Sequence, residues 1–176
     1  MFKCLQCDTE AIGVLQKDAE KLRLYWPVVA DLATPRTPKA VAYYLDQAAR
    51  CESVGANSAA IVMYRSALEN LLHEQNYREG MLGARLGKLF KDAEVGLAPK
   101  WTRDIDRAYL DVINKLGNGA VHANDGDVSK QRTLDEDLLR GLQYAFSQIL
   151  EVVYERPARD ADNLANLLAA SSTFRK

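Results

Sequence analysis

Few of the residues that mark specialised protein classes occur in this sequence. Its three cysteines are an odd number, and its first ten residues lack the apolar core of a signal peptide, so a disulfide framework is not expected. The longest uncharged runs, residues 53–64 and 163–174, are too short and too polar to span a bilayer. The 23 basic and 24 acidic residues give a net charge of -1, which excludes a strong basic excess for nucleic-acid binding over the whole surface. We therefore expect a cytoplasmic protein with no membrane segment.

The remaining composition is that of an ordinary globular domain. Hydrophobic residues make up 48% and charged residues 27% of the 176 positions, so neither a disordered nor a membrane class is indicated. A chain of this length buries roughly 70% of the surface that its unfolded state exposes, which is enough for one domain with a substantial core. Since no segment shows convincing period-two alternation, we predict an all-α fold.

Apolar residues recur at spacings of three and four along most of the chain, and this pattern predicts a bundle of four to five main helices. The helices are expected over residues 38–53, 56–76, 81–93, 101–116 and 134–154. Pro157 is expected to end the last of them. The bundle therefore spans residues 37–157. It lies between an irregular N-terminal arm, residues 1–36, and a tail of residues 158–176 with room for one short helix.

The last predicted helix carries two apolar stripes. One contains Leu138, Leu142 and Ile149, and the other contains Leu139 and Phe146. Two stripes on one helix indicate contacts on two sides, as in a central bundle helix or one that also meets another copy. We predict a homodimer that forms through the fourth and fifth helices.

The second helix contains the first candidate site. Arg65, Glu69 and His73 follow one another at intervals of four residues, a spacing that lets Arg65 and Glu69 pair along one helix face. One interpretation is a solvated ion pair, worth a few tenths of a kcal/mol. The alternative is that Glu69 lies inside, among apolar neighbours, and takes a partner from another helix.

The second candidate site is the segment Gly117–His122, GNGAVH, which follows the fourth helical pattern. Asn118 and His122 share one helix face if the helix continues through them. Near the core their polar groups need partners, and we predict a hydrogen bond from His122 to Glu69 or a link through Asn118, in a structural cluster with Arg65. Gly117 and Gly119 would let this helix approach the second one closely, at a propensity cost of roughly 1 kcal/mol each.

Three motifs in this order resemble a known family. They are Arg65-x-Ala67-Leu68-Glu69, then Gly117-Asn118-x-x-x-His122, then Leu150-x-x-x-Tyr154-Glu155-x-Pro157. Over roughly residues 41–157 they are similar to a bacterial and phage domain-of-unknown-function family placed in the HEPN superfamily of helical nucleotide-binding and ribonuclease domains. The resemblance implies an HEPN-like helical bundle. It also implies a nucleic-acid-associated role in defence or restriction systems, with RNA, a nucleotide or a protein of such a system as partner.

The resemblance also implies a chemistry. Active ribonucleases of that superfamily carry an arginine, a polar residue and a histidine where two copies meet, and His122 and Asn118 match the last two. The histidine moves a proton at the ribose 2′-hydroxyl, and the arginine stabilises the developing phosphate charge without a metal ion. This chain has Gly117 at the arginine position. Losing one charge-stabilising group commonly costs on the order of 10²- to 10³-fold in rate, so Arg65 of the second helix is the candidate replacement.

Candidate cofactor sites are sparse. Cys4 and Cys7 form a CxxC half-site for zinc, but the chain has no second CxxC to complete four ligands. We interpret the pair as two free thiols. Two alternatives come from the resemblance, since relatives often carry a full zinc ribbon: the pair is a degenerate remnant of one, or it binds zinc with a shell completed across a dimer. Cys51 is expected to pack as a small apolar residue, and no other cofactor is expected.

Basic residues gather in the third and fourth helices, at Arg85, Lys88, Arg103 and Arg107. Aspartates alternate with them, which favours a mixed-sign solvated face over a nucleic-acid-binding patch. Three functions remain open. The one we favour is a non-catalytic interaction or nucleic-acid-associated module. The others are a metal-independent endoribonuclease that uses Arg65, Asn118 and His122, and a nucleotide-sensing domain with a pocket lined by these basic residues.

Overall fold

A small antiparallel sheet precedes the helices. The structure is a computed structural model that describes residues 2–3, 10–16, 21–25, 32–121, 129 and 134–173. The sheet has the order β1 (Phe2–Lys3), β2 (Glu10–Gln16) and β3 (Lys21–Tyr25). The predicted irregular arm is therefore wrong for these residues. The apolar alternation in β3 covers only five residues, and strand pairing is a contact between segments that neither segment displays alone.

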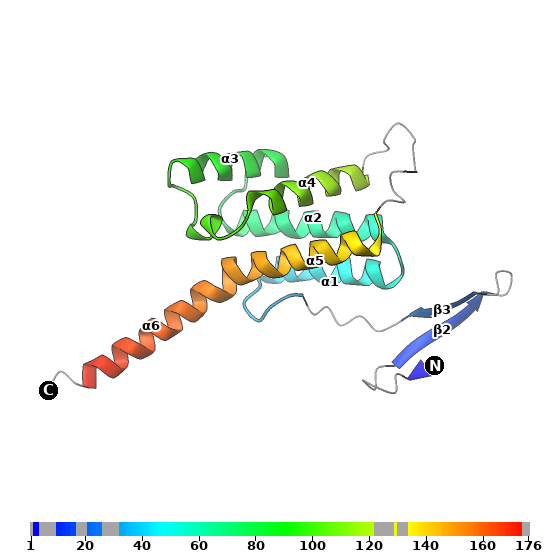
Figure 1. Cartoon of the computed structure of the whole chain (residues 1–176), viewed down its shortest axis with the longest axis horizontal. Helices are drawn as coiled ribbons and strands as arrows, with labels where there is room; N and C mark the ends of the chain where they lie inside the picture. Colours follow the sequence, from blue (N-terminus) through cyan, green and yellow to red (C-terminus); the bar gives the residue numbers. More distant parts are fainter. Residues whose placement is uncertain are drawn as a thin grey trace.

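Five helices form the body of the molecule (Figure 1). They are α1 (Lys39–Ser53), α2 (Asn57–Glu74), α3 (Leu82–Glu94), α4 (Arg107–Val121) and α5 (Glu136–Leu150). The prediction of an all-α bundle is confirmed for this body. None of the helices in the described part of the chain combines the length and the apolar character that crossing a bilayer requires.

Helix α2 is the centre of the bundle, because it packs against α1, α4 and α5. Its buried residues lie on more than one face: Ala60, Ile61, Tyr64, Ala67, Leu68, Leu71 and Leu72. The sharp turn from α1 into α2 passes through Gly55, whose φ of 73° is a conformation that favours glycine. Each fully buried leucine stabilises the fold by roughly 1.5–3 kcal/mol relative to an exposed one, so this helix anchors the core.

The start of the fourth helix differs from the prediction. The apolar pattern begins at Trp101, whereas α4 begins at Arg107. Trp101 lies in a separate 3-10 helix, η1 (Lys100–Arg103), where it is buried and donates an Nε1 hydrogen bond to Gln75 Oε1 at 3.0 Å. Trp101 and Ile105 both pack on the core, so their spacing of four matches a helical pattern although a turn separates them.

The fifth helix does not end at Pro157. After α5, one π-helical turn, η4 (Glu151–Glu155), leads directly into α6 (Arg156–Thr173), which extends away from the bundle in Figure 1. Proline is tolerated in the first turn of a helix, where its missing N–H costs little, and the π turn changes the hydrogen-bond register just before it. The expected short helix of the tail is therefore an 18-residue helix that continues α5.

Candidate functional site

Helices α2 and α4 lie very close together at Gly117. An ideal Cβ built on Gly117 would lie 2.5 Å from Cβ and 2.4 Å from Cδ of Arg65. Real Cβ atoms do not approach other atoms so closely, so only glycine leaves room for the Arg65 side chain at this position. Gly119 is different, because a Cβ there would meet no atom within 4 Å. Of the two predicted close-contact glycines, the structure gives that role to Gly117 alone.

The aliphatic stem of Arg65 lies on Gly117, and its guanidinium reaches two polar groups. Arg65 Nε donates a hydrogen bond to Asn118 Oδ1 at 3.1 Å. Arg65 Nη1 lies 3.5 Å from Glu69 Oε2, one turn further along α2. Asn118 Nδ2 in turn donates to Asn114 Oδ1 at 3.5 Å, so the network continues along α4.

A second arginine joins this network from α3. Arg85 Nη2 lies 3.5 Å from Glu69 Oε1, and Arg85 Nη1 donates to the backbone oxygen of Glu69 at 3.2 Å. Arg85 Nε donates to the backbone oxygen of Gly80 at 2.8 Å. One carboxylate therefore serves two guanidinium groups. Arg65, Glu69, Arg85 and Asn118, called here the arginine cluster, connect three helices and carry one excess positive charge.

The arginine cluster is partly shielded from solvent. The exposed fractions of the side chains are 21% for Arg65, 30% for Glu69 and 14% for Arg85. Glu69 is thus neither an isolated surface residue nor fully buried, and its partner from another helix is Arg85. Charge pairs at this depth are screened less than surface pairs, and planar guanidinium groups match the geometry of a phosphate.

The predicted cluster is only partly visible. Arg65 and Asn118 are brought together as expected, with Asn118 bound to Arg65. His122 lies outside the described residues, so its predicted bond to Glu69 stays a prediction. His73 is exposed at the end of α2. The contact of Arg85 with Glu69 has no signal in the sequence, because it depends on how α3 packs against α2.

A second polar group ties three helices together inside the body. The Tyr64 hydroxyl donates to Glu52 Oε1 at 2.8 Å, and Gln143 Nε2 donates to Glu52 Oε2 at 2.6 Å. Burial raises the pKa of the Tyr64 hydroxyl above its ordinary value, and the hydrogen bond and charge of Glu52 raise it further. Tyr64 therefore remains a neutral donor. This contact of α1, α2 and α5 had no signal in the sequence.

Lys88 of α3 and Arg107 of α4 each have an acidic partner of their own. Lys88 Nζ lies 2.9 Å from Asp92 Oδ2 and over the ring of Tyr77. The hydrogen bond and charge of Lys88, with a hydrogen bond from the Tyr77 hydroxyl, lower the pKa of the Asp92 carboxyl. Burial, with the hydrogen bond to Asp92, raises the pKa of Tyr77 to about 12. Arg103 is exposed in η1. These pairs give a face of mixed sign, as the alternation of charges predicts.

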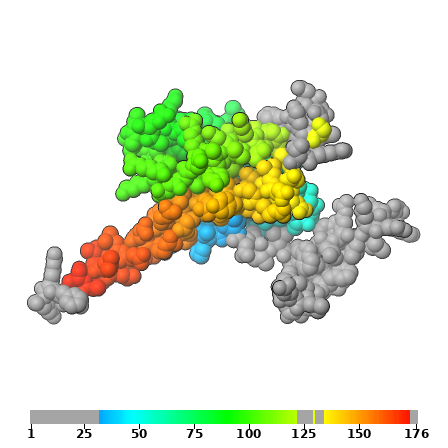
Figure 2. All heavy atoms as spheres, viewed as in Figure 1, coloured from blue at the N-terminus to red at the C-terminus, as the bar shows by residue number. Residues whose placement is uncertain are grey.

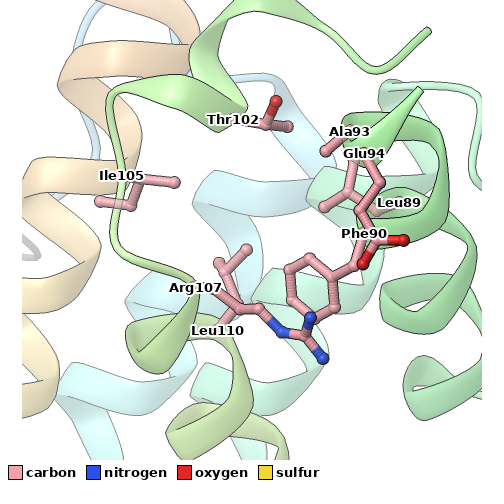
Figure 3. A pocket seen from close by; sticks show the side chains of 8 residues that line it. All are labelled: Leu89, Phe90, Ala93, Glu94, Thr102, Ile105, Arg107 and Leu110. Carbon is pink, nitrogen blue, oxygen red and sulfur yellow. The ribbon is translucent and has the colours of Figure 1, made fainter. Parts of the chain in front are cut away.

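Between α3, η1 and α4 lies a pocket of about 300 Å³ (Figure 3). Its walls are mainly apolar, and the Arg107 guanidinium lies 3.9 Å from the centre of the Phe90 ring. Arg107 Nε is also 3.3 Å from Asp111 Oδ2. Within the described chain, Arg107 is the only basic residue of the lining, and Glu94 lies across the same pocket. This arrangement does not match the set of cations that a nucleotide polyphosphate requires.

The cysteines offer no described metal site. Cys4 and Cys7, the predicted half-site, lie outside the described residues. Cys51 is half-buried and packs against the core, as expected for a small apolar residue. Across the ranges that the structure describes, no group of three or more histidine, cysteine, aspartate or glutamate side chains is placed to hold a metal ion.

Comparisons with known proteins give one match. The model of a protein family described as Domain of unknown function (DUF4145) matches residues 46–167, which covers α2 to α5 and most of α1 and α6. The comparison with curated proteins found no match. The comparison with solved structures found none either.

Proposed function

We propose, from the premise that this chain belongs to the family described as Domain of unknown function (DUF4145), that its helical body is a non-catalytic RNA-associated module. The observation that carries this proposal is the arginine cluster. Its two guanidinium groups are held by Glu69 and Asn118, the cluster carries one excess positive charge, and all three charged side chains keep some exposure to solvent. We infer that the cluster contacts a phosphate of the RNA backbone.

The internal partners of Arg65 support a binding role over catalysis. A catalytic arginine must direct its positive charge at the negative charge that develops on the phosphate in the transition state. Here Arg65 already gives Nε to Asn118 and lies beside Glu69, so its charge is partly neutralised before RNA arrives. The same contacts hold α2 against α4. The main role of Arg65 is thus to hold α2 against α4, and phosphate binding is its secondary role.

A metal-independent endoribonuclease is the second candidate, and one distance favours it. Arg65 Nε is 3.1 Å from Asn118 Oδ1, so a cation lies beside the motif whose own arginine position is Gly117. In that reading, His122 would move the proton and Arg65 would stabilise the phosphate. The order of the motifs supports placing the family in the HEPN superfamily, and with it a cytoplasmic role in a defence system.

Two assays on the full chain separate these functions. Binding to a mixed-sequence single-stranded RNA is followed by fluorescence anisotropy at several salt concentrations, and cleavage is followed on a gel in EDTA. Arg65→Ala, Arg85→Ala and His122→Ala are compared with Arg50→Ala. Arg50 is the matched control, because it also pairs with a carboxylate four residues away, at 2.7 Å, but lies on α1.

We expect RNA binding without cleavage. Arg85→Ala should weaken binding and lower the slope of log affinity against log salt by about 0.7, the value for one lost single-strand phosphate contact. Arg50→Ala should leave both unchanged. Cleavage that disappears in both His122→Ala and Arg65→Ala would establish the endoribonuclease instead. Absence of RNA binding by the unmodified chain would refute the module proposal.

A further inference from the structure

Helix α6 presents an apolar stripe that nothing in the described chain covers. Leu164, Leu167 and Leu168 lie on one face of the helix, with exposed fractions of 57%, 68% and 61%. All described side chains from residue 159 to residue 172 are exposed. Figure 2 shows α6 as a rod that projects beyond the body. A projecting helix with three neighbouring leucines needs another surface to bury them.

The base of α6 is held in this direction by the loop before α1. The Arg36 backbone N–H donates to Glu155 Oε1 at 3.0 Å, and Arg36 Nη2 lies 2.7 Å from Asp162 Oδ2. Arg156 Nη1 lies 3.3 Å from Asp104 Oδ2 on the body. Because α6 also continues α5 without an intervening loop, it cannot fold back along α5 unless the helix breaks.

An apolar groove lies at the other end of α5, between α4 and α5. It has a volume of about 430 Å³, and its apolar walls are Ala108, Tyr109, Val112, Ile113, Leu138, Leu142 and Ala145. Val112 is 46% exposed although it lines this groove. A cavity of about 150 Å³ holds one benzene-sized group, so this groove has room for roughly three apolar side chains.

The stripe and the groove fit each other but cannot meet within one chain. At 1.5 Å per residue, Leu164 lies about 33 Å beyond Leu142 along the same helical direction. The charged residues that line the groove are both aspartates, Asp106 and Asp137. From residue 163 to residue 173 the sequence of α6 contains no charged residue. The leucine stripe therefore brings no like charge to the two aspartates of the groove.

We propose that α6 of a second copy of this chain lies in the α4–α5 groove, with Leu164, Leu167 and Leu168 as its anchors. Two copies exchange their α6 helices, so the same contact forms twice around a twofold axis and the assembly closes as a dimer. The contact between α6 and the groove forms whether or not the chain binds or cleaves RNA.

The test measures the mass of the full chain in solution by light scattering over a range of concentrations. One variant disables the stripe, Leu164→Glu with Leu168→Glu, and one disables the groove, Val112→Glu. Leu97→Glu is the matched control, because Leu97 is 78% exposed and lies outside both surfaces. Each disabling variant should raise the dimer dissociation constant by roughly 100-fold or more, since the contact would then bury an unpaired carboxylate. The control should remain a dimer.

Mixing the two disabled variants identifies the occupant of the groove. The stripe variant keeps an intact groove, and the groove variant keeps an intact α6, so the mixture should form heterodimers through one remaining contact, visible by native mass spectrometry. Pairing of α6 with α6, or of groove with groove, would give no such rescue. A wild-type chain that stays monomeric, a Val112→Glu variant that stays dimeric, or a mixture without heterodimers would each overturn the proposal.

Discussion

Gly117 allows α2 and α4 to lie close together because it has no Cβ. The Arg65 stem occupies the space where a Cβ of residue 117 would lie, and this places the guanidinium beside Asn118. Glycine is a poor helix former, with a cost of about 1 kcal/mol relative to alanine. The packing of α2 against α4 therefore offsets the helix-propensity cost of Gly117.

Gly117→Ala should destabilise the protein, whereas Gly119→Ala should not. At residue 117, overpacking costs typically 1–3 kcal/mol and exceeds the helix-propensity gain of about 1 kcal/mol. At residue 119 the added methyl meets open space, so up to about 1 kcal/mol of stabilisation is expected. Urea unfolding measures both. The penalty of Gly117→Ala should shrink in an Arg65→Ala background, and an unchanged penalty there would refute this account of the contact.

At the scale of elements, two polar groups of side chains each link three helices of the bundle. Glu52, near the end of α1, accepts hydrogen bonds from Tyr64 of α2 and Gln143 of α5. The arginine cluster does the same for α2, α3 and α4. Both sets of contacts use long polar side chains, whose apolar stems pack against neighbours while their polar ends form hydrogen bonds or ion pairs. The bundle is therefore fixed by few polar contacts around an apolar core.

Glu52→Ala should destabilise the bundle by about 1–3 kcal/mol, because it leaves the Tyr64 hydroxyl and the Gln143 amide without an acceptor. Chemical denaturation followed by circular dichroism gives the difference in the free energy of unfolding. Glu79→Ala, an exposed loop residue, serves as control and should change stability little. An equal, small effect for both variants would show that the contact of α1, α2 and α5 contributes nothing measurable.

At the scale of the whole molecule, the loop before α1 contacts η4 and α6, which come last in the described chain. Arg36 precedes α1, yet it contacts Glu155 in η4 and Asp162 in α6. A hydrogen bond from Thr34, together with the backbone N–H and charge of Arg36, holds the pKa of the Glu155 carboxyl below its ordinary value. The ionised form of Glu155 therefore favours the contact between this loop and η4.

The contact of this loop with Glu155 should weaken in acid. A carboxyl whose pKa is lowered by folding contributes stability above its unfolded pKa, and this contribution is lost as the pH falls through the folded value. The difference in unfolding free energy between the wild type and Glu155→Gln should be constant near neutral pH and shrink below about pH 4. Glu79→Gln, at an exposed loop position, is the control variant. A constant difference down to strong acid would contradict the role of Glu155.

Helical periodicity was sufficient to locate the body of the fold. The ranges of α1, α2 and α3 follow from apolar spacing, and Gly55 and Gly96 lie just beyond the ends of α1 and α3. Gly117 and Arg65 are both candidate site residues on the sequence alone. The predicted start of α4 at Trp101 is wrong because a side chain in a turn can reach the core at the same four-residue spacing as one in a helix. The predicted end of the fifth helix at Pro157 is wrong because proline stops a helix interior but is accepted in a first turn after a π turn.

By itself, the sequence determined what depends on neighbours within a few residues: helix positions, the Arg65–Glu69 pairing at one helical turn, and the amphipathic character of each segment. Only the tertiary structure decided which distant groups meet. Arg65 contacts Asn118 across 53 positions of the chain, and Arg36 reaches Asp162 across 126. The register of β2 with β3 is also such a contact. The physical reason is that local backbone geometry repeats along one segment, whereas contacts between segments depend on how all of them pack together.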